Sequence, residues 1–181
     1  DFTCLMLHPS DLPKFRGGSP IQNQIIKGVK KTKVSCFKVT NKIDKGDICL
    51  KKNFYLNGKA EDIYKRLEKI SISMIKQIIK KKKIKFVKQQ GKSSYFKRRK
   101  KENSNLNTLY GTKLNQIFDF IRMLDAEEYP KAFIDTNNFK FEFSNAKIYK
   151  NNIKLIIFFI TSPSIIKIKS PEINFEAFEF A

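Results

Sequence analysis

Histidine, cysteine and long apolar runs are scarce in this 181-residue sequence, and each shortage excludes a class of protein. The three cysteines include no CxxC pair, so the sequence predicts reduced thiols in a cytoplasmic protein and no metal site. The longest strongly apolar stretch, residues 155–160, is too short to cross a bilayer. No apolar signal segment stands at the start, so nothing predicts secretion or a membrane partner.

Arginine is also scarce, although the formal net charge is +20. Of the 37 basic residues, only five are arginine and the others are lysine. The arginines are Arg16, Arg66, Arg98, Arg99 and Arg122. Sites that bind phosphate with bidentate geometry favour arginine. We therefore interpret most of the charge as compositional bias on a solvated surface, and we keep a nucleic-acid partner as the alternative.

A hydrophobic fraction of 41% and 17 phenylalanines predict a packed core, in one domain or one domain with a small appendage. Ser19 as N-cap and Pro20 at the first position predict a short helix that ends at Gly28. Periodicity predicts two further helices, at 59–81 and 112–125, with loops at 9–18, 41–47 and 88–107. The predicted strands are 2–7, 32–40, 48–56, 132–135, 139–143, 153–160 and 165–168. This order indicates an α/β layer followed by a small β-rich part.

One histidine exists in the chain, His8, and it stands where the first predicted strand ends. Ligands bind at such strand ends in open α/β sheets. A structural histidine is the alternative reading of an isolated residue of this kind. Residues 8–21, HPSDLPKFRGGSPI, resemble the HPSLLPxxRGxxPI signature of the folate-dependent formyltransferases, and residues 43–48, IDKGDI, resemble their LDTGDI loop.

Three more segments are similar to that family in the same order. They are AEDIY at 60–64, SYFKRR at 94–99, and FIRMLD at 120–125 with its extension to YPKAF at 129–133. The resemblance covers roughly residues 3–147. It implies an α/β fold: the C-terminal half of a Rossmann-like formyltransferase domain over residues 1–128, followed by a small β-rich subdomain over 129–181. We expect the N-terminal half of the catalytic domain to be missing, and the isolated 181 residues not to form a stable monomer.

The resemblance also implies a site and a reaction. His8 is expected to act as general base or oxyanion donor, with Asp44 orienting its imidazole. Ser10, Arg16 and Gly17 are expected to bind the substrate, although an ion pair that holds the loop explains Arg16 equally well, and a tight turn explains Gly17 better than ligand contact does. Asn41, Ile43 and Asp47 are expected to bind the folate, with a structural cap as the alternative for Asp47.

One departure from the family concerns the position two residues before the histidine, where the family has asparagine and this chain has Met6. Methionine donates no hydrogen bond, and loss of one oxyanion donor costs on the order of 3 kcal/mol of transition-state stabilisation. We expect either a slower enzyme or a compensating donor.

Two classes of function follow from the resemblance. The first is an enzyme that transfers a formyl group from 10-formyltetrahydrofolate, without a metal, to a primary amine. The SDLP variant and the short β tail favour a nucleotide-linked amino sugar as acceptor over initiator methionyl-tRNA. The second is a non-catalytic, basic RNA-binding descendant of the fold. The sequence leaves open whether the protein forms a homodimer.

Overall fold

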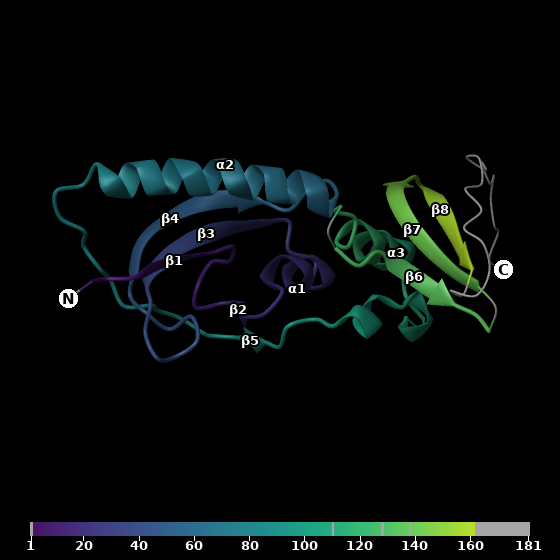
Figure 1. The fold of residues 1–181 in the computed structure, drawn as a ribbon, viewed down its shortest axis with the longest axis horizontal. Helices are drawn as coiled ribbons and strands as arrows, with labels where there is room; N and C mark the ends of the chain where they lie inside the picture. The colour runs from purple at the N-terminus through teal and green to yellow at the C-terminus, as the bar shows by residue number, and fades with distance from the viewer. Residues whose placement is uncertain (1, 110, 128, 138, 162–181) are drawn as a thin grey trace. The chain divides into compact units, whose positions relative to one another are not determined.

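The computed structural model describes residues 2–109, 111–127, 129–137 and 139–161 (Figure 1). The described residues form two compact units, the first built from 2–58 and 62–99 and the second from 59–61 and the described residues between 100 and 161. The domain boundary predicted at residue 128 stays a prediction, and the second unit includes residues on both sides of it.

The sheet of the first unit consists of β1 (Leu5–His8), β3 (Lys31–Lys38) and β4 (Ile48–Tyr55) in the order β1-β3-β4. Both pairings are antiparallel, with Leu7 opposite Cys36 and Cys36 opposite Leu50. His8 ends the first strand, as predicted, and β1 runs antiparallel to its neighbour β3. The three strands were predicted to within three residues, because each has a buried apolar face.

Two helices accompany this sheet, α1 (Pro20–Ile26) and α2 (Ala60–Ile79). Helix α2 runs along the sheet (Figure 1), and Lys52 Nζ donates to Ser73 Oγ at 2.7 Å between β4 and this helix. Phe37 on β3, Phe54 on β4 and Ile63 on α2 are among the fully buried side chains. Of the residues described, no helix is long and apolar enough to cross a membrane.

Ser19 does not cap helix α1 as predicted. It has a left-handed backbone with φ of 46°, its side chain makes no cap hydrogen bond, and Ser19 Oγ instead accepts from Arg99 N at 3.0 Å. Ile26 is 40% exposed, whereas the side chains of Gln22 and Gln24 are buried. The side chain of Gln24 can be buried because it forms a hydrogen bond with the loop beside the helix: Gln24 Nε2 donates to Pro9 O at 2.7 Å.

Two predicted loops contain short regular elements. The loop 9–18 includes β2 (Arg16–Gly17), which pairs in parallel with β5 (Tyr95–Phe96) from the loop 88–107. The 3-10 helices η1 (Lys101–Ser104) and η2 (Leu106–Thr108) follow β5. Sequence periodicity missed these elements because each has four residues or fewer.

The second unit contains α3 (Leu114–Arg122), β6 (Ala132–Asp135), β7 (Phe139–Ile148) and β8 (Ile153–Thr161). The three strands form an antiparallel sheet in chain order, and β6 lies where it was predicted. Strand β7 is five residues longer than predicted, since its pairing with β8 continues past the shift between Ser144 and Lys147. The strand predicted at 165–168 lies outside the described residues.

Candidate active site

The single histidine lies at the end of β1 and is buried, with 7% of its side chain exposed. Its Nε2 lies 2.8 Å from the carbonyl oxygen of Phe15. A carbonyl only accepts, so Nε2 carries a proton and the neutral ring has its lone pair on Nδ1. That atom lies 3.7 Å from Asp44 Oδ2. The structure therefore brings together the two residues predicted as catalytic, which are 36 positions apart in the sequence.

Asp44 is held in place by its backbone as well as its side chain. Its φ is 50°, in the left-handed region, and its side chain is 9% exposed. Oδ2 accepts a hydrogen bond from Gly17 N at 2.7 Å, and the Asp44 carbonyl accepts from Arg16 Nε at 3.1 Å and from Gln89 Nε2 at 2.8 Å. The loop 41–47 is thus fixed against the loop 9–18, and this fixation aims the carboxylate at the imidazole.

Gly17 is required by this arrangement for two reasons. Its φ is 92°, which L side chains rarely adopt, and a Cβ there would meet Phe96 O and lie 2.7 Å from the Tyr95 ring. The β2–β5 pairing places Tyr95 opposite Arg16 and Phe96 opposite Gly17. The turn reading of Gly17 is therefore correct, and it also explains how Gly17 N reaches Asp44.

Ser10 was predicted to bind substrate, and the structure places it inside the loop. It is fully buried, its Oγ donates to Lys14 O at 2.7 Å, and its carbonyl accepts from Ser35 Oγ at 2.7 Å. These bonds shape the turn that carries the residues after His8. A role in substrate contact stays a prediction.

Asp11 in the same loop forms ion pairs with Lys51, at 2.6 Å, and Lys33, at 3.2 Å. Partial burial of the carboxyl would raise its pKa, but the two ammonium groups outweigh that effect and lower the pKa below its ordinary value. This cluster ties the loop to β3 and β4.

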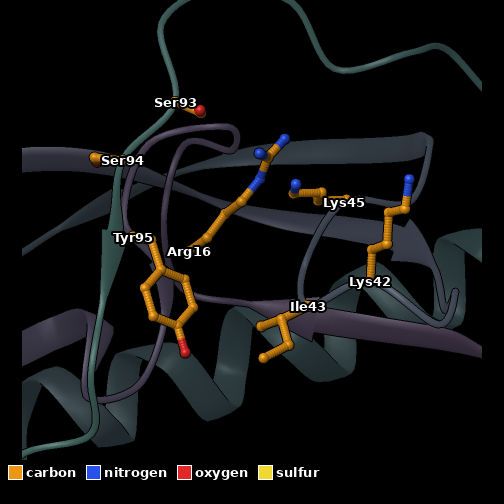
Figure 2. A pocket seen from close by; sticks show the side chains of 7 residues that line it. All are labelled: Arg16, Lys42, Ile43, Lys45, Ser93, Ser94 and Tyr95. Carbon is orange, nitrogen blue, oxygen red and sulfur yellow. The ribbon is translucent and has the colours of Figure 1, made fainter.

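A pocket of about 520 Å³ opens next to the pair and is lined by Arg16, Lys42, Ile43, Lys45 and residues 93–95 (Figure 2). Its volume is within the range of small-molecule sites. Ile43 and Lys45 flank Asp44 in the sequence, and Arg16 Nε bonds to the Asp44 carbonyl, so the pocket adjoins the backbone of Asp44. Neither His8 nor Asp44 is part of its wall.

The three residues predicted to bind folate are separated by the structure. Ile43 is 59% exposed and lines the pocket. Asn41 is exposed at the start of the loop, and the Asp47 carbonyl accepts from Lys38 N at 2.9 Å in the β3–β4 ladder. Only Ile43 of the three lines the pocket.

Sequence reasoning missed Gln89, whose side chain forms hydrogen bonds with the loops 9–18 and 41–47. Its Oε1 accepts from Arg16 Nη2 at 2.6 Å, and its Nε2 donates to the carbonyls of Asp44 and Gly46, each at 2.8 Å. A polar loop residue gives no periodic signal that could have found it. Tyr95 did have a sequence signal, because it belongs to the segment 94–99 that resembles the family. Among the described residues, no group of three or more His, Cys, Asp or Glu could hold a metal ion.

The chain matches two family models. Residues 1–79 match the model described as formyl transferase, and residues 101–157 match the model of the methionyl-tRNA formyltransferase C-terminal domain. The methionyl-tRNA formyltransferase of Rickettsia massiliae is 32% identical over 80 residues, which are 43% of this chain and 26% of that protein. That of Rickettsia prowazekii is 44% identical over 55 residues, 30% of this chain and 18% of that protein. The matched segments thus span about a quarter or less of these curated relatives.

Solved structures give a longer match. The methionyl-tRNA formyltransferase from Clostridium thermocellum superposes with a TM-score of 0.83 and 42% identity, over 90% of this chain and 70% of that one. A 4-N formyltransferase from Francisella tularensis, with a TM-score of 0.66 and 18% identity over 75% of this chain and 58% of that one, shares the fold. The predicted α/β formyltransferase fold with a β-rich C-terminal part is confirmed. The chain belongs to the formyltransferase family.

Proposed function

We propose that this protein transfers a formyl group from 10-formyltetrahydrofolate to a primary amine. The observation that supports the proposal is the buried His8–Asp44 pair, 3.7 Å apart, beside a pocket of about 520 Å³. The resemblance to the family implies that these two residues take part in the reaction. The matched segments cover about a quarter of the curated relatives, so the activity of the whole protein is the hypothesis to be tested.

The reaction forms one bond and breaks another. The amine nitrogen attacks the formyl carbon, a tetrahedral oxyanion forms, and the bond from that carbon to N10 of the folate then breaks. The amine loses one proton and N10 gains one, so a single group that takes and returns a proton serves both steps. In the neutral ring His8 Nδ1 carries the lone pair that can accept a proton, and Asp44 Oδ2 lies 3.7 Å from this atom.

The folate is a substrate of this reaction, and the loop around Asp44 fits part of it. Ile43 and Tyr95 offer exposed apolar surface for a planar ring, being 59% and 56% exposed. Asn41 and Asp47 are placed away from the pocket lining, so we assign Ile43 first among the predicted folate contacts. The chemistry supplied by the folate is the activated formyl carbon, and the chain supplies orientation and proton transfer.

Two observations bear on the acceptor. Residues 101–157 match a methionyl-tRNA formyltransferase C-terminal domain, which removes the length of the β tail as an argument for a sugar. The relative of 42% identity is also a methionyl-tRNA formyltransferase, whereas the sugar formyltransferase cited above shares 18% identity and shows only the fold. We therefore place initiator methionyl-tRNA first and a nucleotide-linked amino sugar, which the SDLP segment favours, second.

The competing class is a basic RNA-binding descendant without catalysis, favoured by Met6 in place of asparagine. The experiment supplies full-length protein with 10-formyltetrahydrofolate labelled at the formyl carbon and, in separate reactions, with methionyl-tRNA or a nucleotide-linked amino sugar. We expect label in one amide product. No transfer to either acceptor and no binding of 5-formyltetrahydrofolate, together with RNA affinity that persists at 200 mM salt, would establish the RNA-binding class instead.

A further inference from the structure

The side chain of Gln89 holds the backbone of the loop that carries Asp44. Its Nε2 donates to the carbonyls of Asp44 and Gly46, each at 2.8 Å, and its Oε1 accepts from Arg16 Nε at 3.2 Å and from Arg16 Nη2 at 2.6 Å. We propose that Gln89 is a positioning residue, which fixes the backbone of Asp44 and so sets the distance from its carboxylate to His8. This inference rests on the proposed function and adds to it a residue that acts through Asp44.

The backbone of Asp44 needs support from outside its own loop. Its φ of 50° is in the left-handed region, which a residue other than glycine keeps only where its surroundings hold it there. The Asp44 carbonyl accepts from Gln89 Nε2 and from Arg16 Nε, the latter at 3.1 Å. Because the guanidinium of Arg16 is itself bonded to Gln89 Oε1, both of these bonds depend on Gln89. One side chain therefore supports the left-handed conformation directly and through Arg16.

The pattern of these bonds requires a primary amide. An amide oxygen accepts from the guanidinium while the amide nitrogen donates two protons, one to each carbonyl. A carboxylate only accepts, so glutamate at position 89 would keep the contact with Arg16 and turn an oxygen toward two carbonyl oxygens. Alanine would make neither contact. The chemistry of the side chain, and not its size, thus decides whether the loop 41–47 is held.

The segment around Gln89 is fixed on both sides, so it can serve as a support. Two residues earlier, Val87 N donates to Ile48 O at 2.9 Å and Ile48 N donates to Val87 O at 2.8 Å, at the start of β4. Five residues later, Ser94 O accepts from Arg16 N at 2.9 Å. These backbone bonds place the amide of Gln89 independently of the loop 41–47. A side chain anchored in this way loses little conformational freedom when it holds that loop.

The first experiment is a double-mutant cycle with full-length protein. The variants are Gln89→Ala and Gln89→Glu, each also combined with Asp44→Ala, and the controls are Gln90→Ala and Gln90→Glu at the exposed next residue. Single-turnover and steady-state kinetics give kcat and the KM for 10-formyltetrahydrofolate. Gln89→Glu keeps the length of the side chain and its contact with Arg16, so it replaces Gln89→Ala in the cycle if the alanine variant does not fold.

We expect both Gln89 variants to lower kcat by roughly ten- to hundred-fold, because a displacement of a catalytic group by about 1 Å costs up to about 100-fold in rate. KM is expected to change less than about two-fold. In the Asp44→Ala background the same replacements are expected to change kcat less than about two-fold, since a residue that acts only through Asp44 has nothing left to position. The Gln90 controls are expected to match the parent protein.

The second experiment does not depend on turnover. Nuclear magnetic resonance at one pH compares the ring protons of His8, which are identified as the signals that His8→Asn removes. Gln89→Ala is expected to move these signals in the same direction as Asp44→Ala, because the carboxylate leaves the imidazole in both variants. Gln90→Ala is expected to leave them in place.

Three results would overturn the positioning role. They are an unchanged kcat in both Gln89 variants, an equal loss of kcat in the Asp44→Ala background, and a change in KM alone, which would make Gln89 a substrate contact. If the parent protein transfers no formyl group, the proposed function fails and the His8 signals decide the position of Asp44. Unchanged signals in both Gln89 variants would then reject the support by Gln89, and the expected movement would establish it.

Discussion

The two units bury polar groups for different purposes. In the first, the loops at 9–18 and 41–47 bury His8 and Ser10 and point Asp44 at the imidazole, beside a pocket. In the second, buried Asp125 accepts from Lys131 Nζ at 2.9 Å and from Asn145 N at 2.7 Å, so it joins the residues after α3 to its own sheet. The buried polar groups of the first unit surround the His8–Asp44 pair, whereas those of the second unit connect the residues after α3 to its sheet.

This difference indicates that the buried polar groups of the first unit serve the candidate site, whereas those of the second unit hold its fold together. It also predicts that substitutions in the two units change different quantities. Changes around His8 are expected to alter rate more than stability, and changes in the second unit the reverse. Each prediction below tests that separation.

The largest expected effect is on catalysis at the His8–Asp44 pair. Replacement His8→Asn removes the proton acceptor, and Asp44→Ala removes the carboxylate that stabilises its protonated form, so each is expected to lower kcat by about 10²–10⁴-fold. Turnover of 10-formyltetrahydrofolate by purified full-length protein measures this. Activity within a few-fold of the parent in both variants would remove the pair from the mechanism and, with it, the contrast between the units.

Met6→Asn is expected to change the rate in the opposite direction. Met6 and His8 lie two apart on β1 and so share a face, and Met6 is 46% exposed, which leaves room for a polar side chain. A new oxyanion donor of this kind adds on the order of 3 kcal/mol, or about 100-fold in kcat. Single-turnover kinetics with Met6→Gln as the matched control measure the gain. An unchanged rate in Met6→Asn would show that another group already serves the oxyanion.

Stability of the first unit is expected to depend on Gly17 far more than on Gly91. Both have a left-handed backbone, with φ of 92° and 98°, but only Gly17 has backbone and ring atoms where a Cβ would stand. Gly17→Ala is expected to lower the free energy of unfolding by about 3 kcal/mol and Gly91→Ala by about 1 kcal/mol. Urea titration followed by circular dichroism compares them. Equal losses would mean that the β2–β5 contact does not constrain the site loop.

Phe120→Ala tests the second unit. Phe120 on α3 is 5% exposed, so Phe120→Ala is expected to lower the free energy of unfolding of that unit by about 3 kcal/mol. Phe158 on β8 is 51% exposed, so the control Phe158→Ala is expected to lower it by less than about 1 kcal/mol. Hydrogen exchange resolved by peptide measures each unit separately. A rise in exchange over β1, β3 and β4 in the Phe120 variant would show that the two units unfold together, which would break the comparison.

The smallest expected effect concerns pH. The pKa of Asp11 is lowered by Lys51 and Lys33, so the unfolded chain binds its proton more readily than the folded one. The ion pairs therefore stabilise the fold above the unfolded pKa, near 4, and this contribution is lost as pH falls through the folded pKa. Because the carboxylate is 39% exposed, we expect Asp11→Asn to cost at most ~1 kcal/mol at pH 6. The difference from the parent is expected to shrink as pH falls below about 4; a constant difference would assign it to packing.

The reactivity of the cysteines provides a further, qualitative prediction. Burial, with Cys49 as neighbour, raises the pKa of the Cys36 thiol to about 12, so it stays protonated at neutral pH. Cys4 is exposed. Timed alkylation followed by mass spectrometry is expected to label Cys4 first and to leave Cys36 unlabelled in the folded protein. Early labelling of Cys36 would indicate that β3 opens locally.

Local patterns were enough to predict most elements. The apolar stripe of residues 59–81 predicted α2, and alternation in 32–40 predicted β3, since a helix or strand needs one buried face whatever the fold. The HPSDLP and IDKGDI strings similarly identified His8 and Asp44. What these strings could not give was the distance between them, because it depends on Gly17 N and Gln89, which lie outside periodic segments.

The sequence by itself determined the family, the main helices and strands, and the identity of the one titratable imidazole. Only the tertiary structure decided which predicted residues meet: Arg16 and Ile43 line a pocket, Ser10 is buried inside its loop, and Asn41 and Asp47 stand apart. The reason is physical. Element formation follows from side-chain periodicity within some twenty residues, whereas a site depends on backbone hydrogen bonds between loops far apart in the chain, and no single residue type encodes those.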